Sequence, residues 1–130
     1  MASFASARSR YVADSVTTLS PGQMIVALYD RLLLDLDRAE AGIGDRDIYQ
    51  AHTALLHAQE IVDQLLLSLD VRSWSGGPSL AALYRHINGE LVDANVRKDV
   101  APIRACRELL LPLRDAWREA AGIVPSKGAS

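Results

Sequence analysis

Apolar residues recur at intervals of three and four along most of the chain, which is the spacing of one face of an α-helix. Such stretches occupy residues 24–41, 48–69, 79–97 and 99–120. No stretch combines sustained apolar–polar alternation with β-branched residues, so no β-sheet is expected. Four helices of about 20 residues joined by short breaks predict an all-α fold, an antiparallel up-and-down four-helix bundle.

Particular residues indicate where these helices begin. Ser20 is suited to cap the first helix, Pro21 to occupy its first position, and Gln23 to complete a capping box. Asp99 has the same capping role before the fourth helix. Pro112 falls inside that helix, where proline removes a backbone hydrogen bond, so we expect a kink there.

The chain has 130 residues, the length of one ordinary domain. We expect a flexible N-terminal tail at residues 1–10 and a single bundle domain at 11–121. Its first part, residues 11–19, is expected to be a mobile arm or a short extra helix. Residues 122–130 contain two glycines and a proline and are expected to be a flexible C-terminal tail.

Composition and charge exclude several classes of function. Apolar residues make up 49% of the chain and aromatic residues only 5%, so the core must be aliphatic. The formal charge of −2 gives no basic surface for nucleic acid or for an anionic membrane. No apolar run approaches the roughly 18 residues that a membrane span needs, and no stretch resembles a signal peptide. A cytoplasmic protein, without nucleic-acid binding or membrane insertion, is therefore expected.

Side chains for metal or covalent chemistry are not arranged as such sites require. No glutamate is followed three residues later by histidine, the di-iron signature of helical bundles. His52 and His57 are five residues apart and would point about 140° away from each other on a helix. Cys106 lies on an apolar seam, where cysteine acts as a small hydrophobe. We therefore expect no enzyme activity, no metal and no cofactor.

The predicted helices carry more apolar surface than a bundle interior requires. Val26, Tyr29 and Leu33 widen the apolar face of the first helix, and Leu56 and Leu67 lie opposite the seam of the second. These residues either cover a lopsided core or form a groove for an amphipathic helix of a partner. Periodicity alone does not distinguish the two interpretations.

A series of short motifs extends from Tyr11 to Trp117. In order, these are Tyr11-x-x-x-Ser15-Val16-x-Thr18-x-Ser20-Pro21, Leu28-Tyr29-Asp30, His52 with Leu56-x-Ala58-Gln59-x-Ile61-Val62, Gly76-Gly77, Leu83-Tyr84, Ala94-Asn95 with Asp99, and Leu113-Arg114-x-Ala116-Trp117. Their order and spacing resemble the FliS family, the flagellin-specific export chaperones. Two residues depart from the family pattern. Arg31 stands where the family often has glycine, which affects groove shape or partner preference, and Pro112 is not expected.

The resemblance implies a cytosolic chaperone that binds the disordered C-terminal segment of flagellin. Binding would prevent premature polymerisation and help delivery to the flagellar type III export apparatus. The implied partners are flagellin, the flagellar export gate and another flagellar regulator. The candidate flagellin-binding residues are Tyr11, Val12, Val26, Tyr29, Leu33, Leu56, Leu67 and Tyr84.

Two questions stay open at this level. Tyr11 is either a removable plug in the flagellin pocket, as the resemblance implies, or a staple against Met24 or Leu28. The chain as a whole is either this chaperone or a self-associating structural bundle or adaptor, in which a homodimer buries the apolar excess. An enzyme or electron carrier built on a bundle is disfavoured because the necessary ligands are lacking.

Overall fold

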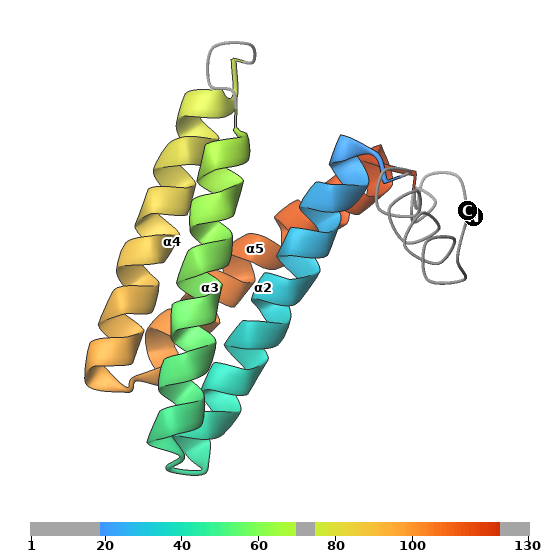
Figure 1. Ribbon diagram of the computed structural model, residues 1–130. Coiled ribbons are helices and arrows are strands. Elements are labelled where there is room, and N and C mark those ends of the chain that lie inside the picture. Colours follow the sequence, from blue (N-terminus) through green and yellow to red (C-terminus); the bar gives the residue numbers. More distant parts are fainter. Residues whose placement is uncertain (1–18, 70–74, 123–130) are drawn as a thin grey trace, which may run out of the picture.

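The computed structural model describes residues 19–69 and 75–122, which contain four α-helices (Figure 1). These are α2 (Pro21–Gly44), α3 (Ile48–Ser68), α4 (Gly77–Arg97) and α5 (Val100–Ala120). No strand occurs in this part of the chain, and the all-α prediction is confirmed. The predicted tail at 1–10, all but the last residue of the predicted arm at 11–19, and all but the first residue of the predicted tail at 122–130 lie outside the described residues.

The start of α2 has the capping box that the sequence predicts. The Ser20 Oγ accepts a hydrogen bond from the Gln23 backbone N–H at 3.1 Å, and the Gln23 side chain accepts one from the Ser20 N–H at 2.8 Å. Pro21 opens the helix, as the capping residues predict, three residues before the apolar periodicity begins at residue 24. Asp99 caps α5 through a bond from the Ala101 N–H at 3.0 Å, also as predicted. These caps satisfy N–H groups that have no partner inside the helix.

The end of α2 differs from the prediction for a packing reason. The glycine-containing stretch after residue 41 was expected to end this helix, but α2 continues to Gly44. Gly42 is buried against α3, where a β-carbon would lie 2.8 Å from the Ala51 backbone nitrogen. Glycine here therefore permits the two helices to approach closely instead of breaking the first one.

Successive helices run in opposite directions, and each packs against two others. α2 contacts α3 and α5, and α4 contacts the same two, so α2 and α4 face each other diagonally. Figure 1 shows α2 and α3 close together at their connecting turn and further apart towards the start of α2. A β-carbon built on Gly22 would lie 3.3 Å from the Cβ of Ala121, so the start of α2 and the end of α5 lie together.

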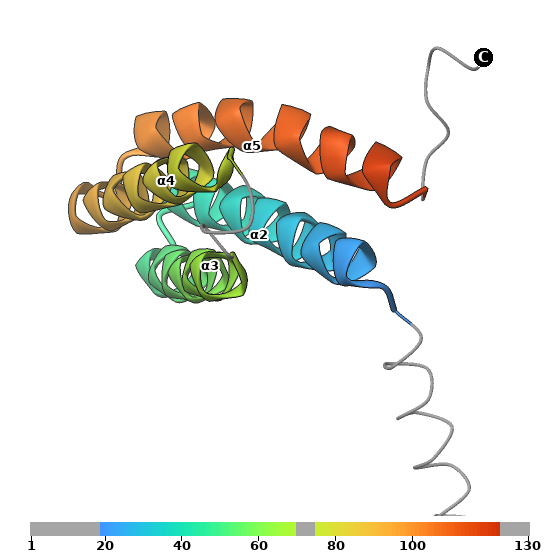
Figure 2. The same cartoon turned by 90° about the horizontal axis from the view of Figure 1, so that it is seen from above.

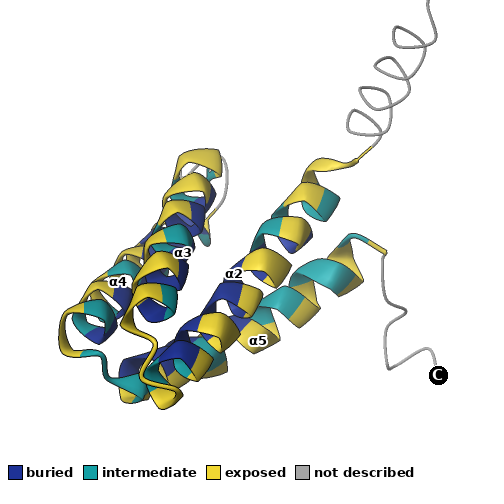
Figure 3. Cartoon of the chain, turned by 60° about the horizontal axis from the view of Figure 1, so that its bottom comes forward, coloured by how far each residue is buried: buried dark blue, intermediate teal, exposed yellow. Residues whose placement is uncertain are grey.

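The buried side chains form one aliphatic core with two tyrosines. In Figure 3 the buried positions face inward on all four helices, while the outer faces are exposed. The largest fully buried apolar side chains are Tyr29, Leu32, Leu36, Leu55, Leu65, Tyr84, Ile87, Leu91, Ile103 and Leu110. The spacing of these residues in the sequence is the apolar periodicity from which the bundle is predicted.

Pro112 does not break α5. The helix continues past it to Ala120, and Pro112 lies on the exposed side. Figure 2 shows that the axis of α5 bends between its ends. An exposed position suits a proline, because the backbone group that loses its hydrogen bond can be solvated.

Candidate functional site

An apolar pocket of about 410 Å³ lies where the helices diverge, and we call it the end pocket. It is formed by the start of α2, the end of α3, the start of α4 and the last turns of α5. Its lining residues are Pro21, Met24, Ile25, Leu28, Leu65, Ser68, Leu69, Leu80, Tyr84 and Trp117. A volume of this size and a mostly apolar lining are typical of ligand-binding cavities.

The pocket exists because seam residues at these helix ends are not fully covered by the opposite helix. Ile25, Leu28, Leu69 and Trp117 are only partly buried, although they pack against the core. Met24 is 51% exposed at the rim. Apolar side chains left open to water gain free energy when an apolar partner covers them.

The inner side of this pocket is formed in part by Tyr84, which is bonded to a second tyrosine in the core. Tyr84 lines it, and its hydroxyl group lies 2.7 Å from the hydroxyl of Tyr29, a hydrogen bond between the diagonal helices α2 and α4. Both side chains are almost fully buried, with 0% and 2% exposure. The bond therefore fixes the distance between α2 and α4 at the base of the pocket.

Both hydroxyl groups stay protonated at neutral pH. Burial raises the pKa of Tyr29, and hydrogen bonds from the Tyr84 and Trp117 side chains oppose this effect. Burial also raises the pKa of Tyr84, and its bond to Tyr29 adds to the increase. The end pocket therefore presents a neutral surface.

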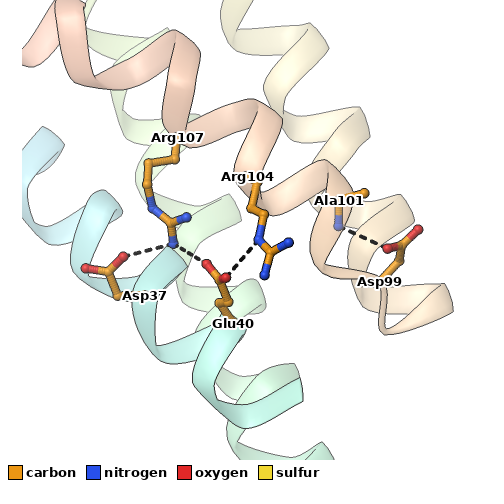
Figure 4. A network of polar contacts seen from close by, with 6 residues as sticks. All are labelled: Asp37, Glu40, Asp99, Ala101, Arg104 and Arg107. Atoms are coloured by element: carbon orange, nitrogen blue, oxygen red, sulfur yellow. Dashed lines mark hydrogen bonds and ion pairs between the residues drawn. The ribbon is translucent and has the colours of Figure 1, made fainter. Parts of the chain in front are cut away.

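A ladder of ion pairs holds α2 against α5. Arg107 contacts Asp37 at 2.9 Å and Glu40 at 2.7 Å, and Arg104 contacts Glu40 at 2.9 Å (Figure 4). Arg114 contacts Asp30 at 3.0 Å further along the same two helices. Hydrogen bonds from Arg104 and Arg107 lower the pKa of Glu40. The ladder therefore fixes the pair of helices that carries Met24 and Trp117.

The eight candidate flagellin-binding residues fall into three groups. Tyr11 and Val12 lie outside the described residues. Leu56 and Leu67 are exposed, at 43% and 87%, on the outer face of α3. The other four are buried in the core: Val26, Tyr29, Leu33 and Tyr84. Of the eight, only Tyr84 lines the end pocket.

Most residues of the end pocket were interpreted from the sequence as ordinary seam positions. Ile25, Leu28, Leu65, Leu69 and Trp117 all follow the core periodicity. Periodicity gives the face of a helix but not where two helices separate along their length. One feature of the sequence could have indicated the pocket. Leu65, Leu69 and Leu80 flank the longest predicted break between helices.

The structure was expected to hold neither a reactive cysteine nor a metal site, and two observations bear on these groups. Cys106 is fully buried, and burial raises the pKa of its thiol to about 12. Within residues 19–69 and 75–122, no group of three or more His, Cys, Asp or Glu side chains could hold a metal ion. Among the helices described, none has the length and hydropathy of a membrane span.

Comparisons with known proteins agree on one family. The family model described as "Flagellar protein FliS" matches residues 4–124. The flagellar secretion chaperone FliS of Bacillus subtilis is 29% identical over 110 residues, which cover 85% of this chain and 82% of that protein. The proteins of the same name from Escherichia coli and Salmonella typhimurium are each 31% identical, over 83% of this chain and 81% and 82% of their own lengths. The chain therefore belongs to the FliS family.

Proposed function

We propose that this protein is a cytosolic export chaperone that binds the disordered C-terminal segment of flagellin. The bound segment is kept from polymerising and is delivered to the flagellar export gate, with a further flagellar regulator as another partner. The observation that carries the proposal is the end pocket, whose apolar lining is left partly uncovered by the protein's own described helices.

The chemistry of the pocket fits a segment that folds as it binds. A disordered chain that becomes an amphipathic helix supplies apolar side chains at the spacing that a groove between helices accepts. Part of the interaction free energy is lost to ordering the segment, so a broad apolar contact is needed. Leu56 and Leu67 extend the contact to the outer face of α3, where both are exposed.

The four buried candidate residues take an indirect part in this proposal. Tyr29 and Tyr84 set the separation of α2 and α4 below the pocket, and Val26 and Leu33 pack within the core. Their substitution would alter the shape of the docking surface through the fold. Direct contact with flagellin is proposed for Leu56 and Leu67 and for the rim of the end pocket.

Tyr11 and Val12 are proposed to cover the end pocket when flagellin is absent. Support comes from the connection between this segment and the pocket. Leu19 is 44% exposed and directly precedes the cap of α2, and Pro21 and Met24 already line the pocket. A short chain segment before Leu19 can therefore reach it. Tyr11→Ala should raise flagellin affinity and increase the mobility of residues 11–18 in NMR relaxation. If the affinity and the mobility are both unchanged, the hypothesis that Tyr11 is a plug is wrong.

Calorimetric titration with the last forty or so residues of the cognate flagellin tests the main proposal. Apolar burial with coupled folding predicts a negative heat-capacity change. Met24→Glu should weaken binding at least about tenfold, because the bound state would bury an unpaired charge. Val96→Glu is the matched control, since Val96 is 78% exposed on α4 and lies outside the pocket.

Two results would overturn the proposal. One is the absence of binding by the wild-type protein at millimolar peptide. The other is equal binding by Met24→Glu and Val96→Glu, which would place the contact away from the end pocket.

Self-association is a second candidate, favoured by the exposed apolar side chains Leu67, Val92 and Val96. Light scattering with and without the flagellin peptide separates the two functions. If the peptide converts a dimer into a one-to-one complex, the same surface serves both self-association and flagellin binding. A dimer that the peptide leaves unchanged favours a structural bundle.

A further inference from the structure

Asp35 is the only charged side chain that is buried among the described residues, with 2% exposure. It lies on α2 at the edge facing α3. Two cationic or polar groups hold it: His57 on α3 bonds through Nδ1 to Oδ2, and Arg31 on α2 places Nε 3.4 Å from Oδ1. Burying a carboxylate is costly unless it is paired, so these contacts are required for the fold.

The two contacts leave donors free on the solvent side. Arg31 uses Nε towards Asp35, so both of its Nη groups remain available, and its side chain is 48% exposed. His57 uses Nδ1, so Nε2 remains, as an acceptor in the neutral ring and as a donor in the protonated ring, and this side chain is 39% exposed. The buried carboxylate therefore orients the Arg31 guanidinium and the His57 ring towards the surface, as a supporting group does for the ligands of a metal.

These groups lie around a second cavity of about 470 Å³ between α2 and α3, near the turn that joins them. Arg38, one turn after Asp35, lines it and has no ion pair among the described residues. Asp47 also lines it and keeps its negative charge, although its Oδ1 accepts the Gln50 backbone N–H at 3.0 Å. The donors available to a ligand are the remaining N–H groups of the Arg31 and Arg38 guanidiniums, and the Arg31 charge is already paired with Asp35.

We propose that this cavity, the arginine groove, binds the carboxylate side chains of an acidic segment of a partner protein. Guanidinium groups bind carboxylates through two parallel hydrogen bonds, and Arg31 and Arg38 supply two such groups on one face of α2. The exposed ring of Tyr49, 80% accessible, gives the groove an apolar edge for the peptide chain beside its acidic side chains.

The arginine groove is separate from the end pocket and shares no lining residue with it. The inference therefore stands whether or not flagellin is the partner at the end pocket. It adds a surface on which an acidic partner can bind while the apolar site is occupied.

NMR titration of the ¹⁵N-labelled full chain with a capped hexaglutamate peptide, in phosphate-free buffer at low salt, tests the groove. The backbone signals of residues 31–38 and 49–57 should shift most. Arg31→Gln and Arg38→Gln should each weaken binding at least about threefold, because each removes a charge-assisted contact. Arg85→Gln is the control, since this exposed arginine on α4 lies outside the groove. Arg38→Gln is the safer variant, because Arg38 makes no ion pair within residues 19–69 and 75–122.

Three outcomes would overturn the inference. Capped hexaglutamine producing the same shifts would show that charge is not recognised. An equal loss in Arg85→Gln would show only a general effect of net charge. Inorganic phosphate saturating the same signals at lower concentration than hexaglutamate would assign the groove to phosphate instead of protein carboxylates.

Discussion

The hydroxyl groups of Tyr29 and Tyr84 lie 2.7 Å apart, although their helices, α2 and α4, do not pack against each other. The ring centroids are 6.4 Å apart and the rings are tilted by 59°. Two long side chains thus bridge the bundle diagonally, where shorter residues would not meet. The bridge joins the core to the base of the end pocket.

Removing the two hydroxyl groups should destabilise the protein by less than the sum of the two single removals. Tyr29→Phe or Tyr84→Phe leaves the other hydroxyl buried without its partner, at a cost of about 1–3 kcal/mol in the free energy of unfolding. The double variant removes both polar groups, so its loss should be smaller than the sum of the single losses. Urea denaturation measures the three values, with Tyr49→Phe as a control at an exposed position. Strictly additive losses would contradict the bridge.

Gly42→Ala should lower the free energy of unfolding by about 1–3 kcal/mol. The added β-carbon would lie 2.8 Å from the Ala51 backbone nitrogen, so α2 and α3 would have to separate. Gly89→Ala is the matched control, because a β-carbon there meets nothing within 4 Å. That change should instead stabilise α4 by about 0.5–1 kcal/mol through helix propensity. Thermal or urea unfolding should show opposite signs for the two variants.

The ion pairs of Glu40 should stabilise the protein at neutral pH and not at low pH. Its pKa is lowered from the ordinary value of 4.5 by hydrogen bonds from Arg104 and Arg107. The stabilisation is therefore present above that value and is lost as the pH falls through the lower, folded-state pKa. Glu40→Gln should cost under about 1 kcal/mol at pH 7, as expected for a surface network, and less at pH 3.

Urea unfolding at both pH values measures this difference. Glu60→Gln removes an exposed carboxyl group outside the ladder and should show no such pH dependence. A cost for Glu40→Gln that is unchanged between the two pH values would exclude an electrostatic origin.

Cys106 should be unreactive until the protein unfolds. Its side chain is fully buried, and burial raises the pKa of the thiol from 9.0 to about 12, so very little thiolate is present at pH 8. Labelling with a disulfide reagent should be at least about a hundredfold slower in the native protein than in guanidinium chloride. Rapid labelling of the native protein would indicate local opening of α5.

The sequence predicts the four helices and the core because both follow from short-range periodicity and caps. Leu32, Leu55, Ile87 and Leu110 lie where a 3.6-residue repeat places them, and each is fully buried. The Ser20 cap is equally local, since all its atoms lie within one turn. Gly42 is the exception, because its role depends on the neighbouring helix and not on its own.

The two candidate sites depend on relations between helices that periodicity does not contain. Trp117 has the spacing of a core residue, but the divergence of the helices leaves it lining a pocket. Asp35 is polar within an apolar stretch of α2, and its burial depends on His57 of another helix. A charged residue on a predicted core face was the signal that could have revealed the arginine groove.

The close approach of Gly22 to Ala121 has a practical consequence for handling this protein. Affinity tags or fusion partners attached at either terminus would leave the bundle beside the opening lined by Pro21 and Trp117, and could obstruct it. Fluorescent labels are better placed at the α4–α5 turn, at the other end of the molecule (Figure 1). Cleaving terminal tags before any affinity measurement is therefore advisable.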